Sequence, residues 1–199
     1  MQDLAAVHGM GWFTMSKRLS EMTLEELWQL FPIYLTAHDD RWGTWYHEEY
    51  QRLYALLPNK NVRINHIGST AIENIWAKPI IDILVEIPFE EDMGGVRDLI
   101  VQNGYICMAE SAERISLNKG YTENGFAEKV FHIHLRYWGD NDEVYFRDYM
   151  NSNPILAKEY EEQKLTFWKL YEHDRDGYTD AKHGFVSEYT QKAKEEYKR

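Results

Sequence analysis

The chain has few features that would crosslink it or attach it to a membrane. Its single cysteine, Cys107, excludes an intramolecular disulfide and every zinc site built from several cysteines, and is most simply a buried apolar residue. No uninterrupted apolar run approaches the roughly 20 residues that cross a bilayer. The N-terminal residues lack the basic start and compact apolar centre of a signal peptide. We therefore expect a cytoplasmic protein.

Positive charge is also scarce. With 22 Lys and Arg against 33 Asp and Glu, the formal net charge is -11. Duplex nucleic acid and anionic membranes bind to dense positive surfaces, so neither is an expected partner. A single nucleotide or another phosphorylated small molecule needs only a few local cations and is not excluded. Hydrophobic residues make up 44% of the chain and aromatic residues 15%, which indicates a folded globular protein.

Hydrophobic periodicity predicts a mixed sheet followed by a helical C-terminal third, that is, an α/β (mixed α+β) fold. A capping box at Thr23 and Glu26 marks the first helix. The predicted strands are 33–37, 62–68, 79–87, 105–109, 114–118 and 130–138, with a polar loop at 119–129. The predicted helical segments are 24–31, 40–57, 90–102, 142–153, 154–173 and 178–199.

The domain organisation is simple, because the chain has no internal repeat and no Pro- or Ser-rich linker. We take residues 1–22 as an N-terminal extension and residues 23–199 as a single domain. Met15 is an alternative start to Met1. Nothing in the sequence specifies an oligomeric state.

The first candidate site is the turn Gly68-Ser69-Thr70, which leaves one predicted strand. Glycine lets the backbone approach a ligand closely, and the following amides and hydroxyls can bind phosphate oxygens. A turn with a Ser or Thr cap is the commoner explanation of such a motif. The turn gains weight as a phosphate site only because a carboxylate follows it.

That carboxylate is Asp82, which lies in an apolar strand with Glu86 on the same face. A carboxylate with a second oxygen donor can hold Mg²⁺, which bridges to nucleotide phosphates. Paired carboxylates for two-metal chemistry are commonly one residue apart, and here that position is Leu84. Glu86 could equally be a solvated residue at the end of the strand.

The third element is the pair His132 and His134, which shares one strand face with Arg136. Two imidazoles at this spacing can bind one transition metal or two phosphate oxygens. A site of two histidines is incomplete by itself, and an exposed histidine pair without a ligand is the alternative.

Taken together, these motifs resemble the GrpB (UPF0157) family over residues 33–190. The resemblance is carried by "HIGSTAIENIWAKPIIDILVEI", "HDDRW", "FHIHL", "FRDYMNSNPILAKEYEEQK" and "YTDAKHGFV". It implies a nucleotidyltransferase-like mixed sheet flanked by helices. The positions that match the family pattern are His66, Gly68, Ser69, Thr70, Lys78, Asp82, His132, His134, Arg147, Tyr178 and Lys182.

The leading hypothesis is a metal-dependent enzyme that transfers a nucleotidyl or phosphoryl group to a small-molecule acceptor. The predicted catalytic residues are Ser69 and Asp82. Magnesium would bind Asp82, assisted by Glu86 or by His132 and His134. The nucleoside triphosphate would be held by His66, Gly68, Ser69, Thr70, Lys78, Arg147 and Lys182.

Two other hypotheses stay open. The missing carboxylate at Leu84 favours a module that binds a nucleotide or metabolite without transforming it. The histidine pair favours a transition-metal protein. The sequence also departs from the family pattern after the turn, where Glu73, Asn74 and Trp76 replace small residues.

Overall fold

The structure is a computed structural model that describes residues 17–197. The alternative start at Met15, and residues 1–16 of the predicted extension, lie outside the described residues. The division into an extension and a single domain stays a prediction.

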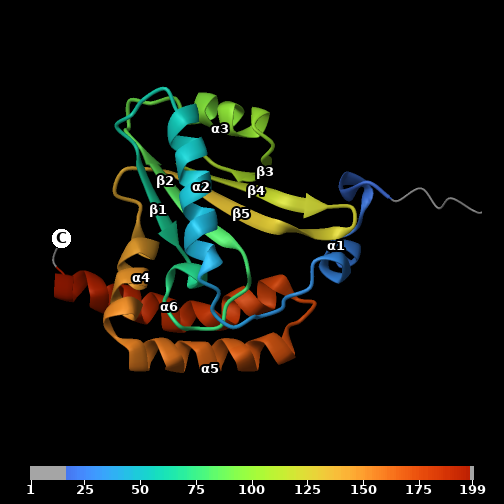
Figure 1. Cartoon of the computed structure of the whole chain (residues 1–199), viewed down its shortest axis with the longest axis vertical. Coiled ribbons are helices and arrows are strands. Elements are labelled where there is room, and N and C mark those ends of the chain that lie inside the picture. The colour runs from blue at the N-terminus through green and yellow to red at the C-terminus, as the bar shows by residue number, and fades with distance from the viewer. Residues whose placement is uncertain (1–16, 198–199) are drawn as a thin grey trace, which may run out of the picture.

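The centre of the described chain is a five-stranded mixed sheet in the order β1-β2-β5-β4-β3 (Figure 1). The two central strands, β2 and β5, are parallel, and every other neighbouring pair is antiparallel. The strands are β1 (Arg63–Ile67), β2 (Ile81–Ile87), β3 (Ile106–Glu110), β4 (Arg114–Thr122) and β5 (Gly125–Tyr137).

Helices lie before, between and after the strands, and the predicted helical C-terminal third is present. They are η1 (Leu19–Glu21), α1 (Leu24–Leu30), α2 (Arg41–Leu56), η2 (Ser69–Ala71), α3 (Met93–Gln102), α4 (Asp142–Ser152), α5 (Pro154–Leu170) and α6 (Arg175–Tyr197). The predicted capping box is formed, since Glu26 N donates to Thr23 Oγ1 at 3.2 Å and Thr23 N donates to Glu26 Oε2 at 2.7 Å. No helix between residues 17 and 197 combines the length and apolar character of a membrane span.

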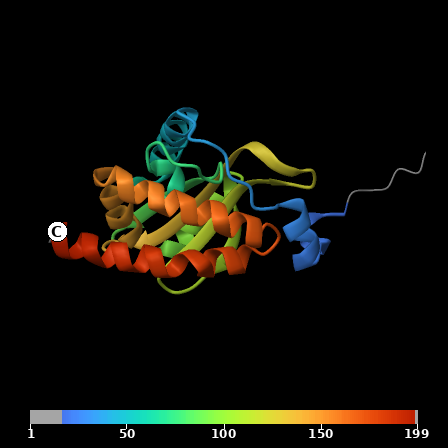
Figure 2. The ribbon, with the colours of Figure 1, turned by 90° about the horizontal axis from the view of Figure 1, so that it is seen from below.

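The two faces of β2 have different surroundings, as the alternation of its side chains predicts. Ile81, Ile83, Val85 and Ile87 are fully buried in the main core, where they meet apolar side chains of α2 and α3. The opposite face carries Asp82, and α5 and α6 lie across that side of the sheet (Figure 2). A second, smaller core joins α4, α5 and α6 to the segment that follows η2. The acidic strand face is therefore enclosed by the C-terminal helices.

Two predictions of local structure are wrong. Residues 33–37 do not form a strand, because only Thr36 makes a bridge, with Ala77. The predicted polar loop 119–129 is mostly sheet, since β4 continues to Thr122 and β5 begins at Gly125. Its polar residues belong to a hairpin, where alternate side chains face solvent without breaking the ladder.

Candidate functional site

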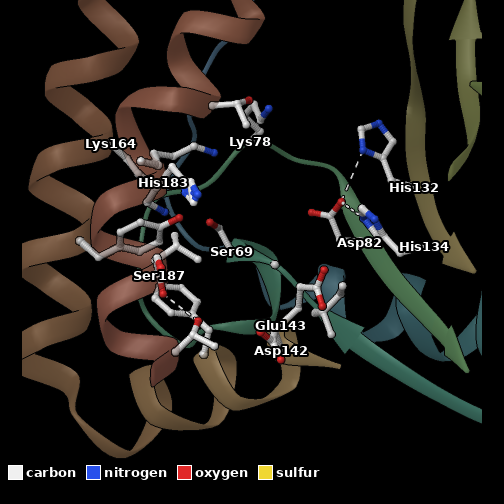
Figure 3. Close-up of a pocket in the computed structure, with 18 of the residues that line it drawn as sticks. Ser69, Lys78, Asp82, His132, His134, Asp142, Glu143, Lys164, His183 and Ser187 are labelled. Carbon is white, nitrogen blue, oxygen red and sulfur yellow. Dashed lines mark hydrogen bonds and ion pairs between the residues drawn. The ribbon is translucent and has the colours of Figure 1, made fainter. Parts of the chain in front are cut away.

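A cavity of about 780 Å³ lies between the acidic face of the sheet and the C-terminal helices (Figure 3). Its walls come from the turn at Gly68, strands β2 and β5, and helices α4, α5 and α6. This volume is within the range of small-molecule sites. Seven of the site residues predicted from the sequence meet here, since the cavity is lined by Gly68, Ser69, Lys78, Asp82, His132, His134 and Lys182.

Asp82 lies on the sheet wall with the two histidines beside it. The parallel register pairs Asp82 with His132 and Leu84 with His134, which places both imidazoles next to the carboxylate. Asp82 Oδ1 is 3.4 Å from His132 Nδ1 and 3.3 Å from His134 Nε2. Burial by itself would raise the pKa of Asp82, but the hydrogen bonds from the two histidines bring it well below its usual value. Asp82 is therefore an ionised acceptor.

Gly68 lies directly against this carboxylate. Its φ is +71°, in the left-handed region, and a Cβ at this position would overlap Asp82 Oδ2. Only glycine combines that backbone conformation with such a close approach. Gly68, the first residue of the predicted phosphate turn, therefore leaves room for the side chain of Asp82.

We expect Gly68→Ala to destabilise the protein by roughly 2 kcal/mol or more, because left-handed strain of about 1–2 kcal/mol adds to the overlap. For a chain of this size the melting temperature would fall by about 4–8 °C. Gly104→Ala is the matched control, since Gly104 has a φ of +90° and open space where the Cβ would lie. Calorimetry of both variants measures the difference. Equal losses in the two would show that Asp82 does not constrain Gly68.

Opposite Asp82, three lysines reach the cavity from three different elements. Lys78 precedes β2, Lys164 belongs to α5 and Lys182 to α6. Lys78 Nζ and Lys182 Nζ lie 5.3 and 4.4 Å from the centre of the Tyr178 ring. Neither makes an ion pair with a carboxylate among residues 17–197. We call these three side chains the lysine cluster.

Burial and mutual repulsion weaken the charge of the lysine cluster. Burial and the ammonium of Lys182 lower the pKa of Lys78 to about 7. The same two causes lower the pKa of Lys164 to about 7. Burial also lowers the pKa of Lys182 to about 8, although Asp82 opposes this shift. A bound anion would offset the repulsion, so both the charge and the position of the cluster favour an anionic ligand.

The other residues of the predicted turn are only partly available. Ser69 lines the cavity together with Tyr160. Thr70 Oγ1 donates to the carbonyl of Ile80 at 3.0 Å and contacts His66 Nε2, also at 3.0 Å. His66 lies on the opposite sheet face and stacks on Tyr46, with ring centres 4.7 Å apart. Burial lowers the pKa of His66 to about 4, so it is a neutral structural residue.

Two predicted ligands lie away from the cavity. Glu86 is almost fully buried, and its Oε1 accepts hydrogen bonds from Gly139 N at 3.0 Å and Asn141 Nδ2 at 3.2 Å. Arg147 donates to the carbonyl of His66 at 2.7 Å and pairs with Asp148. Glu86 therefore holds the loop after β5, and Arg147 contacts the end of β1. The sequence had predicted Glu86 as a magnesium ligand and Arg147 as a ligand of the nucleoside triphosphate.

The predicted magnesium set does not fit a metal held by the protein. Glu86 is engaged elsewhere and Leu84 is apolar, so Asp82 is the one carboxylate of β2 that lines the cavity. No three His, Cys, Asp or Glu side chains among residues 17–197 are arranged to hold a metal ion. The same finding argues against a transition-metal centre formed by His132 and His134. Magnesium that enters bound to a nucleotide would be part of the substrate.

Sequence reasoning missed several residues of the site. Lys164 is fully buried on the face of α5 that also carries Ala157, Tyr160 and Glu161. The signal was a lysine at an apolar helical spacing, which is costly unless the side chain has a purpose. Tyr121 was taken as part of a loop, yet its hydroxyl lies 2.8 Å from His132 Nε2.

Comparison with known proteins places these features in a family. The family model described as "GrpB protein" matches residues 32–192. The "Glutamate-rich protein GrpB" of Alkalihalophilus pseudofirmus is 32% identical over 162 residues, which cover 78% of this chain and 92% of that protein. The UPF0157 protein YqkA of Bacillus subtilis is 30% identical over 69% of this chain, but over 41% of its own length.

Among solved structures, the GrpB protein from Enterococcus faecalis aligns with a TM-score of 0.71 and 27% identity, over 83% of this chain and 100% of that one. This confirms the predicted fold class, a mixed α/β fold with a mixed sheet flanked by helices. None of these relatives is named for a reaction, so the chemistry has to be argued from the cavity itself.

Proposed function

The chain belongs to the GrpB family, and from that premise we propose that its cavity binds a nucleotide or another phosphorylated small molecule. The observation that carries this proposal is the lysine cluster. Three ammonium groups share one cavity, and neither Lys78 nor Lys182 makes a direct ion pair with a carboxylate among the described residues, although Asp82 acts on both at longer range. Buried cations that make no ion pair are unfavourable, and a phosphate group would supply the missing partner.

The second candidate function is transfer of a nucleotidyl or phosphoryl group from that ligand to a small acceptor. Asp82 favours it, because an ionised carboxylate facing an anion site repels a phosphate and weakens pure binding. Such a group is useful where a proton has to be accepted or a reacting group oriented. Ser69, on the wall between Asp82 and the lysine cluster, would orient the phosphate by hydrogen bonding (Figure 3).

Binding can be tested with tripolyphosphate, which carries the charge of a nucleotide without its base. We expect its affinity to fall roughly tenfold or more between pH 7 and pH 9, because each charged hydrogen bond contributes about 1.5–3 kcal/mol. The pKa of Lys78 is about 7 and that of Lys182 about 8, so both ammonium groups lose protons over this range. Binding therefore takes up protons, which titration calorimetry in buffers of different ionisation enthalpy measures.

The ligand loses no negative charge as the pH rises, so a site of ordinary lysines would bind it equally well at pH 9. An affinity that stays flat or increases over this range would contradict the proposed role of the lysine cluster. Binding that survives replacement of all three lysines would contradict the proposed site.

A further inference from the structure

The two histidines beside Asp82 look alike in sequence but differ in their hydrogen bonds. We propose that His134, oriented by Asp82, accepts the proton of the acceptor hydroxyl. This inference rests on the proposed transfer function. It assigns His132 a positioning role, together with Tyr121 and Arg175.

Both ring nitrogens of His132 are occupied. Its Nδ1 faces Asp82 and its Nε2 lies 2.8 Å from the hydroxyl of Tyr121. Arg175, the first residue of α6, donates from Nη2 to the same hydroxyl at 2.9 Å. A guanidinium can only donate, so the Tyr121 oxygen accepts from Arg175. The Asp82 carboxylate can only accept, so Nδ1 of the neutral His132 ring carries the proton, and the Tyr121 proton points to the lone pair on Nε2.

The hydrogen-bond chain therefore runs in one direction, from Arg175 through Tyr121 and His132 to Asp82. It fixes the proton of His132 on Nδ1, where it is donated to the carboxylate. Burial also lowers the pKa of His132, which keeps the ring neutral. His132 has no free lone pair to offer a substrate.

His134 is different because only one of its nitrogens is used. Its Nε2 lies 3.3 Å from Asp82 Oδ1, and since a carboxylate only accepts, that nitrogen carries the proton. Its Nδ1 then bears the lone pair. Within residues 17–197 this atom makes no hydrogen bond, and it is not among the buried side-chain atoms that lack a partner. The side chain is 26% exposed and lines the cavity, so the lone pair is open to a ligand.

The register explains why this position matters. His134 is paired directly with Leu84, and both lie on the sheet face that carries Asp82. Leu84 is fully buried and does not line the cavity, whereas His134 does. The group that faces the cavity at this level of the sheet is therefore an imidazole, which can accept a proton near neutral pH without a metal.

The proposed step moves one proton and exchanges one bond at phosphorus. The acceptor O–H gives its proton to His134 Nδ1 as its oxygen forms a bond to phosphorus. The bond between phosphorus and the leaving oxygen breaks, and the leaving group departs with the electron pair; with a nucleoside triphosphate it is pyrophosphate in nucleotidyl transfer and the nucleoside diphosphate in phosphoryl transfer. Asp82 stabilises the imidazolium, which then releases its proton to water.

Diethyl pyrocarbonate tests the assignment without any turnover, because it acylates the unprotonated nitrogen of an imidazole. Peptide mass spectrometry would follow each histidine, with the exposed His47 as internal reference. We expect His134 to react roughly tenfold faster than His132, whose lone pair must first leave a hydrogen bond. Tyr121→Phe frees Nε2 and should raise the rate of His132 while that of His134 is unchanged.

Equal reactivity of the two histidines, or an unreactive His134 beside a reactive His47, would overturn the proposal. Protection of His134 by tripolyphosphate supports the binding site as well. Selective reaction without protection keeps the assignment of the free nitrogen and contradicts the proposed binding function, so the two failures are distinct.

The transfer reaction supplies a second readout. His134→Ala should lower turnover about 100-fold or more, as removal of a general base does. Free imidazole should restore part of this loss. Rescue of His132→Ala in place of His134→Ala would reverse the two roles and overturn the proposal.

Discussion

Lys78→Met is expected to weaken tripolyphosphate binding while making the ligand-free protein more stable. The affinity at pH 7 should fall roughly 10- to 100-fold, since a hydrogen bond to a charged group contributes about 1.5–3 kcal/mol. Lys78 shares the Tyr178 ring with Lys182 and makes no direct ion pair with a carboxylate among the described residues. A methionine of similar length removes the charge and keeps the packing.

The gain in stability has the same origin as the loss of binding. Burial and repulsion from Lys182 lower the pKa of Lys78 from 10.5 to about 7, so the folded state disfavours the ammonium form relative to the unfolded chain. Removing the group removes that penalty, and we expect roughly 1–2 kcal/mol of added stability, or about 3–6 °C in melting temperature.

Lys169→Met is the control, because Lys169 is an exposed lysine of α5 outside the cavity. It should change neither quantity. A Lys78→Met protein that is less stable and still binds tripolyphosphate would show that this lysine is structural. Calorimetric melting and ligand titration of the same samples separate these outcomes.

Asp82→Asn should separate binding from catalysis. Turnover of labelled nucleoside triphosphates, supplied as magnesium complexes, should fall by about 10²–10⁴, because the amide can no longer hold both imidazoles in the productive tautomers. Affinity for metal-free tripolyphosphate should not fall, since one negative charge facing the anion is removed. Pyrophosphate release and calorimetry measure the two effects.

Asp180→Asn, an exposed position on α6, is the control for a lost surface charge. Full turnover in Asp82→Asn would remove Asp82 from the mechanism. If the natural sequence binds a nucleotide tightly but shows no turnover with many acceptors, the protein is a binding module and not a transferase.

The sequence allowed the composition of each strand face to be predicted, but not the neighbours of each strand. Alternation places Asp82 and Glu86 on one face of β2, and His132 and His134 on one face of β5. The alternation does not show that β2 and β5 are adjacent and parallel. Their parallel pairing is what brings the two histidines to Asp82. The fate of Glu86 depends on the loop at Gly139, whose conformation no strand pattern encodes.

The burial of residues on the helices was harder to predict than the faces of the strands. Lys182 was predicted through the family pattern, whereas Lys164 was not, although both reach the same cavity. A lysine on a helix is usually solvated, and its burial depends on how α5 packs against the loop at Trp76, whose carbonyl accepts from Lys164. Residues 33–37 were misread because their apolar side chains fill the core from an extended segment without a ladder partner.

The parallel pairing of β2 and β5 has a consequence for how the protein is assembled. Asp82 and His134 are 52 residues apart along the chain, so their contact forms only after a long loop has closed. Two of the three lysines lie later still, on α5 and α6. During synthesis, a chain halted before α5 could complete its sheet and hold an ionised aspartate with no cations opposite it. The proposed phosphate site would therefore be completed last, after both C-terminal helices have packed on the sheet.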